Sequence, residues 1–482
     1  MTSPVAVPRR LILAWLGLPT LLFLAGFVAP MFAVPLLVLL PIAAWLAVRH
    51  PPHEGADRDR WLLAMVGGLL LLALAGFPRG PFAWDWIKHW ALLDALAREP
   101  WPVSLDLRDS PAYLRFYVAA YLVPALVLPW VGPALALGGW FGIGYVLLLR
   151  GVSLASTRGG RHAAAAMLLF LGVAGADLLA QTLLRALDGA PWAVVGIHAE
   201  NWWVDAFGDQ LQLTGVLAAL LWVPHQAIAT GLFVVLLLYD RGRAGLAACV
   251  VAFGLLALWS PFGMAGALPL LAVRVWQERH DCRSAAGVAI VAAAGFGGLM
   301  AWILTFQAPP VGACLACLPA RLESLPRLLL FWSVELVLFV LVLGARLWRD
   351  GLCRAALLVV LALGFLHGET TDLVMRVSLA PLAVLALRSV QVLLSPQPQR
   401  RPLALLLGLT LTLPTAASEA AYHLSGGAAH RALPLHDRLH QTWMVTFAGR
   451  TNYTVTEFLD RCGWRYRQQY FSSQPPPAIK RR

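Results

Sequence analysis

Residues 61–78 have the sequence WLLAMVGGLLLLALAGFP, an apolar run without a single charged side chain. Its length approaches the roughly 20 residues that cross a bilayer as a helix. Similar runs, rich in Leu, Ala, Val and Gly, recur along a chain of 482 residues that is 59% hydrophobic and only 13% charged. Continuous runs satisfy their own backbone only as helices, whereas a membrane β-barrel shows short alternating segments. The sequence therefore predicts an all-α, polytopic transmembrane helical bundle.

The apolar runs predict about thirteen crossings of the membrane. They lie near residues 11–29, 31–48, 61–78, 134–152, 162–177, 213–238, 244–258, 262–276, 285–305, 328–346, 354–367, 379–394 and 403–421. The basic clusters between them then all fall on one side, which the positive-inside rule makes the cytoplasmic side. We expect a cytoplasmic N-terminus and an outer, periplasmic C-terminus.

This topology divides the chain into three parts. An N-terminal membrane hairpin covers residues 1–60, and a transmembrane core covers 61–421, with outer loops at 79–133 and 177–212. A short periplasmic tail covers 422–482 and ends in a loose segment.

The apolar segment 111–131 is an exception to the alternation. Counting it as a crossing would put either the loop around Asp85 or the basic loop 150–161 on the wrong side. We therefore predict that it lies at the interface. Its composition permits this, because Pro124 and Pro129 would interrupt a straight helix and several side chains suit the headgroup zone, namely Arg115, Tyr113, Tyr117, Tyr121 and Trp130. The alternative is a true span with a re-entrant neighbour.

The excess of 37 Lys and Arg over 25 Asp and Glu does not indicate nucleic-acid binding. The basic residues stand in short clusters between apolar runs, where they act as topology signals. The six cysteines form no zinc-like array, although Cys314 and Cys317 have the spacing of a local disulfide.

The first outer loop contains the stretch Trp84-Asp85-Trp86-Ile87-Lys88-His89. On a helix, spacings of three and four place Asp85, Lys88 and His89 on one side, where they could form a base beside an anion-binding cation. The plainer interpretation is a solvated loop with interfacial tryptophans. Asp177, at the outer end of a later span, favours a functional role, because a carboxylate there is costly without polar surroundings.

Other polar residues on the outer side suggest binding roles. The stretch that contains His198, Glu200, Asn201, Trp202 and Trp203 suits a sugar or a polar lipid head, or else an interfacial aromatic belt. His225 and Gln226 lie inside an apolar run, where polar residues line a cavity or bond a neighbouring helix.

Arg376 lies on the outer side, against the positive-inside tendency. Asp372, one helical turn earlier, could serve as its structural counter-ion, or Arg376 could hold a lipid phosphate. The sequence contains no Walker loop, GxSxG elbow or HExxH motif, so nucleotide hydrolysis, serine hydrolysis and zinc proteolysis find no support.

The layout of residues 61–394 resembles the GT-C class of polytopic glycosyltransferases, which includes protein O-mannosyltransferases, aminoarabinose transferase and arabinosyltransferases. Asp85, the 111–131 segment and Asp177 match the class order of an acidic first outer loop, interfacial helices and a second acid. The stretches 222–226 and 372–381 are similar to segments of uncharacterised bacterial membrane proteins that we associate with this class. Many members have an Asp-Asp or Asp-Glu pair where this chain has only Asp85, so dependence on Mg or Mn stays open.

The resemblance implies transfer of a sugar from a polyprenyl phosphate donor to a glycan, lipid or protein acceptor. Asp85 would deprotonate the acceptor hydroxyl, and Asp177 would orient the acceptor or a metal. The negative charge that grows on the departing phosphate would be stabilised by Arg376, Lys88 or Arg115. Asn201, Trp202 and Trp203 would contact a sugar. The high content of Ala, Gly, Leu and Arg is compatible with a bacterial source with GC-rich DNA. We therefore expect the protein in the bacterial inner membrane.

Two other classes of protein remain open. A transporter or lipid flippase fits the composition equally well, although its site would lie near the membrane midplane between broken helices. A non-enzymatic scaffold would tolerate replacement of the outer acids.

Overall fold

The computed structural model describes residues 7–31, 33–34, 37–38, 58–77, 86–106, 111–114, 116–156, 158–187, 199–203, 211–279, 325–366, 372–395, 402–424 and 471–472. The predicted span 285–305, most of the predicted span 31–48, and the Cys314–Cys317 pair lie outside these residues.

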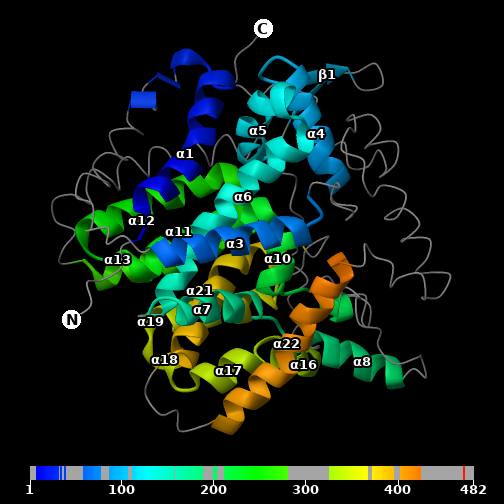
Figure 1. Ribbon diagram of the computed structural model, residues 1–482, viewed down its shortest axis with the longest axis vertical. Coiled ribbons are helices and arrows are strands. Elements are labelled where there is room, and N and C mark those ends of the chain that lie inside the picture. Colours follow the sequence, from blue (N-terminus) through cyan, green and yellow to red (C-terminus); the bar gives the residue numbers. More distant parts are fainter. Residues whose placement is uncertain are drawn as a thin grey trace.

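The described chain is mostly helical, in agreement with the predicted all-α class (Figure 1). Its helices are α1 (Arg9–Gly26), α3 (Arg58–Leu74), α4 (Trp86–Arg98), α5 (Ala119–Val131), α6 (Pro133–Val152), η1 (Ser153–Ala155), α7 (Arg161–Leu171), α8 (Asp177–Leu187), η2 (Ala199–Asn201), α10 (Val216–Trp222), α11 (Pro224–Tyr239), α12 (Gly242–Trp259), α13 (Pro261–Gln277), α16 (Leu325–Glu335), α17 (Val337–Leu343), α18 (Arg346–Arg349), α19 (Gly351–Leu363), α20 (Asp372–Val377), α21 (Leu379–Leu393) and α22 (Pro402–Leu424). Three short strands, β1 (Ser104–Asp106), β2 (Pro111–Leu114) and β3 (Phe471–Ser472), form one antiparallel sheet in the order β1-β2-β3.

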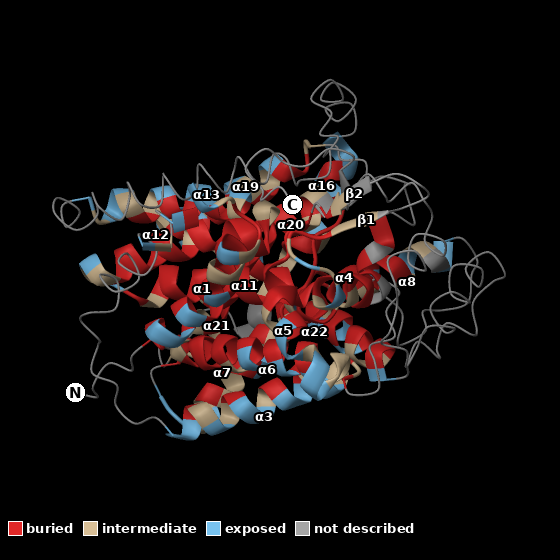
Figure 2. Ribbon diagram, turned by 90° about the horizontal axis from the view of Figure 1, so that it is seen from above, coloured by how far each residue is buried: buried red, intermediate tan, exposed pale blue. Residues whose placement is uncertain are grey.

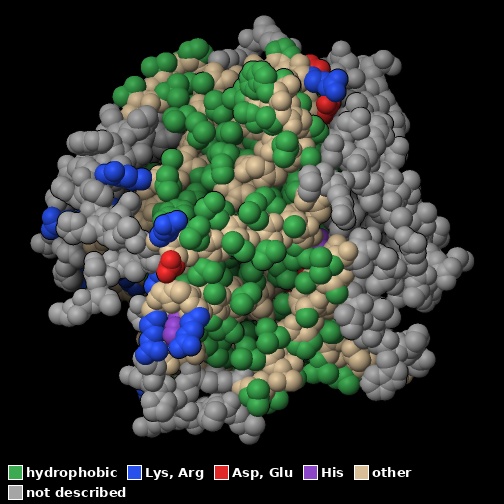
Figure 3. Space-filling view, in the orientation of Figure 1, with side chains coloured by type: hydrophobic (Ala, Val, Ile, Leu, Met, Phe, Trp, Pro, Cys, Tyr) green, Lys and Arg blue, Asp and Glu red, His purple; other side chains and the backbone are tan. Residues whose placement is uncertain are grey.

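Within the described residues, four segments are long and apolar enough to cross a membrane: Arg9–Gly26, Pro133–Ala155, Gly242–Trp259 and Leu325–Leu343. Figure 3 shows a broad hydrophobic face with charged side chains at its left edge and upper right. Helix α3 contributes exposed apolar side chains, among them Met65, Leu69 and Leu70. These features are compatible with a membrane protein.

Helix α11 is central, with almost every residue buried among α6, α12, α13 and α21 (Figure 2). Small residues allow close approach elsewhere: a Cβ on Gly68 of α3 would lie 2.8 Å from Val146 of α6. Trp15 of α1 stacks against both Trp140 and Trp259, at centroid distances of 5.3 and 4.2 Å. The N-terminal helix therefore packs directly onto the core.

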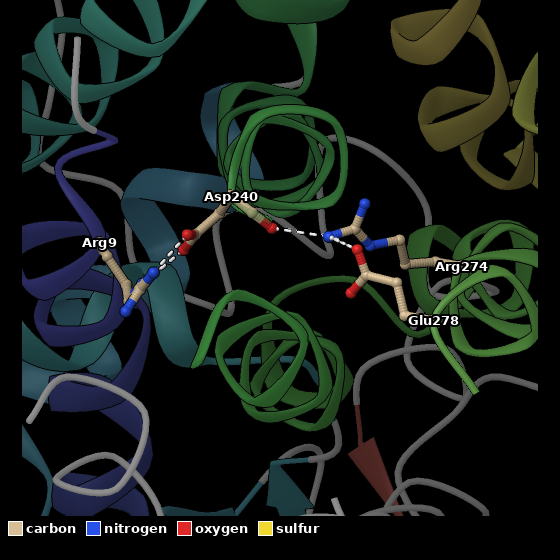
Figure 4. Close-up of polar contacts among 4 residues, drawn as sticks. All are labelled: Arg9, Asp240, Arg274 and Glu278. Atoms are coloured by element: carbon tan, nitrogen blue, oxygen red, sulfur yellow. Dashed lines mark hydrogen bonds and ion pairs between the residues drawn. The ribbon is translucent and has the colours of Figure 1, made fainter. Parts of the chain in front are cut away.

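Polar contacts tie the ends of α1, α11 and α13 together (Figure 4). The Arg9 guanidinium binds the Asp240 carboxylate, which links the start of α1 to the end of α11. Arg274 of α13 donates to the Asp240 carbonyl oxygen at 2.9 Å and pairs with Glu278 at 2.7 Å. Arg60 of α3 likewise donates to a backbone carbonyl after α6, at 2.7 Å.

Several details differ from the sequence-based predictions. The single span predicted over 213–238 consists of two helices, because α10 ends at Trp222 and Pro224, which has no N–H to donate, opens α11. The 111–131 segment begins as strand β2, and α5 then continues through Pro124 and Pro129 without interruption. The predicted tail contacts residues 111–114 of the predicted outer loop 79–133, since β3 pairs with β2.

Candidate functional site

The predicted site residues fall into three groups in the structure. Asp85, Arg115 and His198 lie outside the described residues, and Asn201 and Asp372 are described only in their backbone, at the end of η2 and the start of α20. The remaining eight side chains are all buried, with at most 7% of their surface exposed: Lys88, His89, Asp177, Glu200, Trp202, Trp203, His225 and Arg376.

Four of these eight residues meet in what we term the cationic cluster, which consists of Lys88, His89, Tyr117, Tyr121, His225, Gln226 and Arg376. The His89 Nδ1 atom contacts the Tyr121 hydroxyl, and Arg376 donates to the Tyr117 hydroxyl. The His225 ring lies 5.1 Å from the His89 ring and 5.6 Å from the Tyr117 ring, between centroids. The sequence analysis did not single out the two tyrosines as binding residues.

The cluster forms where the ends of several helices converge. Lys88 and His89 lie in the first turn of α4, and Tyr117 and Tyr121 lie just before and just inside α5. Pro224 starts α11, so the positive end of that helix's dipole lies beside His225. Arg376 comes from the short helix α20, which approaches α13 closely because Gly266 has no side chain.

The cationic cluster combines two positively charged side chains with two buried histidines. Burial lowers the pKa of His89 well below its usual value, and the nearby charges of Lys88 and Arg376 lower it further. His89 is therefore neutral at pH 7, while Lys88 and Arg376 contribute positive charge. Guanidinium and ammonium donors suit a phosphate or carboxylate ligand.

Asp177 and Glu200 belong to a second group, the acidic cluster, which consists of Asp177, Glu200, Glu335 and Glu419. The Gly215 N–H donates to Glu200 Oε1 at 2.8 Å, and Trp202 Nε1 donates to Glu335 Oε1 at 3.2 Å. The backbone N–H of Ala176 donates to the Val334 carbonyl at 3.0 Å, which holds the start of α8 against α16.

Gly175 is required where the start of α8 meets α16. A Cβ on Gly175 would lie 2.6 Å from Glu335 Oε2 and 2.8 Å from Asp177 Oδ2. The two carboxyl groups therefore lie on the same side of the Gly175 backbone, close to one another.

Glu335 and Glu419 were missed by the sequence analysis, although each lies inside a predicted span. Acidic residues inside apolar runs are themselves a signal, because they are costly in a membrane. Trp222 donates its indole N–H to Glu419, and His423 contacts the same carboxyl oxygen at 3.1 Å. These contacts connect α10 with α22.

Burial raises the pKa of Glu200 well above its usual value, and the charges of Asp177 and Glu419 raise it further. Glu200 therefore tends to retain its proton. Within the described part of the chain, no group of three or more His, Cys, Asp or Glu side chains is arranged to hold a metal ion.

The tryptophans predicted to contact a sugar pack inside the protein. Trp202 and Trp203 meet edge to face at 5.4 Å, and the Trp203 ring lies 5.1 Å from Phe331 of α16. Both indoles are at most 2% exposed. Trp202 thus contributes to the acidic cluster by donating a hydrogen bond to Glu335.

Comparisons with family models, with curated proteins and with solved structures gave no match to this chain. The resemblance to the GT-C class rests on the sequence features described above.

Proposed function

We propose that this chain is a membrane glycosyltransferase of GT-C type, which transfers a sugar from a polyprenyl phosphate donor to a glycan, lipid or protein acceptor on the periplasmic face. The cationic cluster is the observation that carries the proposal. Lys88 and Arg376 come from helices far apart in the sequence, and both are buried beside tyrosine and histidine side chains. A phosphate group would supply the negative charge that such a site favours.

Two sets of polar contacts support the thirteen-span topology on which this proposal depends. Arg9 meets Asp240, and both are assigned to the cytoplasmic side. Arg376 meets Tyr117, and both are assigned to the outer side. A chain in the inner membrane with a cytoplasmic N-terminus would therefore place the cationic cluster on the periplasmic side, where sugars linked to polyprenyl phosphate would be used.

The reaction assigns a role to each cluster. Asp85, one residue before α4, would take the proton of the acceptor hydroxyl, and the hydroxyl oxygen would form the new bond to the sugar carbon. The bond from that carbon to the phosphate oxygen would break, and its electron pair would stay on the polyprenyl phosphate. Lys88 and Arg376 would stabilise that charge. Asp177, in the acidic cluster, would help to orient the acceptor.

The test is native mass spectrometry of the purified protein with added polyprenyl phosphate. We expect the lipid to bind the wild type and to be lost in Arg376→Ala. Arg388→Ala is the control, because Arg388 is also a helical arginine but is only partly buried and pairs with Asp350. Arg376→Lys, which keeps the charge, should retain partial binding. A folded wild type that binds no polyprenyl phosphate would refute the proposal.

One observation favours a transporter or lipid flippase as the second candidate. The break between α10 and α11 falls inside a predicted span, beside His225 and Gln226, and transporters often form their sites at such breaks. Proteoliposomes distinguish the two functions: a flippase moves the lipid-linked sugar across the bilayer with the sugar still attached, whereas a transferase releases the polyprenyl phosphate. Asp85→Asn should abolish only the transferase activity, that is, the release of polyprenyl phosphate.

A further inference from the structure

A chain of hydrogen bonds leads from the start of α13 to His225. The Gly263 N–H donates to Ser260 Oγ at 2.9 Å, so the Ser260 hydroxyl keeps its own proton for another bond. It donates that proton to Gln226 Oε1, also at 2.9 Å. Ser260 therefore fixes which end of the Gln226 amide is the acceptor.

The orientation of the Gln226 amide determines the protonation of the neighbouring imidazole. Its NH₂ group donates to the Tyr117 hydroxyl at 3.0 Å and approaches His225 Nε2 at 3.2 Å. Because an amide NH₂ can only donate, His225 Nε2 must be the acceptor. A neutral imidazole then carries its single proton on Nδ1.

The Nδ1–H group of His225 is a buried donor. The side chain is 1% exposed, and Nδ1 has no hydrogen-bond partner among the described residues. A buried donor without a partner is costly, so a ligand that accepts this hydrogen bond would remove the cost. Arg376 donates to the Tyr117 hydroxyl, and the Tyr117 ring stacks on the His225 ring at 5.6 Å between centroids. A cation thus lies close to this imidazole, and an anion is the acceptor that suits both groups.

We propose that His225 donates its Nδ1–H to a non-bridging oxygen of the lipid phosphate, and that Gln226 and Ser260 are positioning residues that hold the required tautomer. The inference rests on the proposed function, because it concerns the same cluster, and it defines the ligand as a phosphate oxyanion. Free phosphate has the same chemistry, so the test must separate the two sources.

The test combines binding with nuclear magnetic resonance of protein labelled with ¹³C and ¹⁵N at histidine, in lipid nanodiscs. His225→Phe identifies the His225 signals among those of the 12 histidines. We expect the Nδ1–H tautomer in the wild type and a shift of the Nδ1 signal on addition of polyprenyl phosphate. Loss of a hydrogen bond to a charged group predicts about ten- to hundredfold weaker binding in His225→Phe.

Further variants distinguish a positioning role of Ser260 and Gln226 from a general loss of structure. Ser260→Ala and Gln226→Leu should give mixed tautomers and weaker binding. Ser389→Ala is the control, because Ser389 is also a fully buried serine but lies in α21, outside the cluster, and its replacement should change neither the tautomer nor the binding. A wild-type Nε2–H tautomer, or an affinity unchanged in His225→Phe, would overturn the inference.

The same data separate this inference from the proposed function. Polyprenyl phosphate binding that needs Arg376 but not His225 leaves the proposed function standing and removes the role of His225. Inorganic phosphate that shifts the Nδ1 signal as strongly, at equal concentration, overturns the assignment to a lipid. A wild type that binds neither probe refutes both proposals.

Discussion

Gly266→Ala should disrupt the contact that positions Arg376. A Cβ on Gly266 of α13 would lie 1.9 Å from the carbonyl oxygen of Val377, whereas real Cβ atoms essentially never come closer than 3.0 Å. Because the obstructing atom is backbone, α13 and α20 must move apart by at least the difference, about 1.1 Å. Overpacking of this kind typically costs about 1–3 kcal/mol of stability. Val377 follows Arg376 directly, so the movement also displaces the guanidinium from Tyr117.

We therefore expect Gly266→Ala to lower the melting temperature in detergent, followed by tryptophan fluorescence, and to weaken polyprenyl phosphate binding. The control is Gly139→Ala in α6, where an added Cβ meets nothing within 4 Å. That change should leave binding intact and stabilise the helix slightly. A Gly266→Ala protein with wild-type melting and binding would show that α13 and α20 do not approach as closely as described.

Two further predictions concern buried charges. Asp240→Asn removes the carboxylate that binds the buried Arg9 guanidinium, and it should lower the free energy of unfolding by about 3–5 kcal/mol, followed by thermal unfolding. The double variant Arg9→Met, Asp240→Leu should recover much of this loss. Equal instability of the single and double variants would contradict the ion-pair argument. The raised pKa of Glu200 means that the folded protein holds a proton that the unfolded chain loses above about pH 4.3, so this residue makes stability fall as pH rises. Glu200→Gln should therefore melt above the wild type at pH 8 and depend less on pH between 5 and 8, and an unchanged pH slope would refute the assignment.

The helical class could be predicted because it depends on local sequence. Apolar runs predict where helices form, and Pro224 is a local signal for the start of α11 that the long run 213–238 concealed. The sheet could not be predicted in the same way, because Leu114 pairs with Phe471, more than 350 residues later. Likewise, the continuity of α5 through Pro124 depends on its packing rather than on propensity.

The site could be predicted residue by residue but not as a spatial arrangement. Polar residues in an apolar chain identify Lys88, His225 and Arg376 as unusual, yet only tertiary contacts separate them from the acids. The sequence analysis placed acids and cations alike on the outer side, whereas the described residues form two clusters of opposite charge. Trp222 contacts the acidic cluster and His225, three residues later, belongs to the cationic one. The helix break at Val223 therefore lies between the two clusters, so a rotation of α10 against α11 would move residues of both clusters.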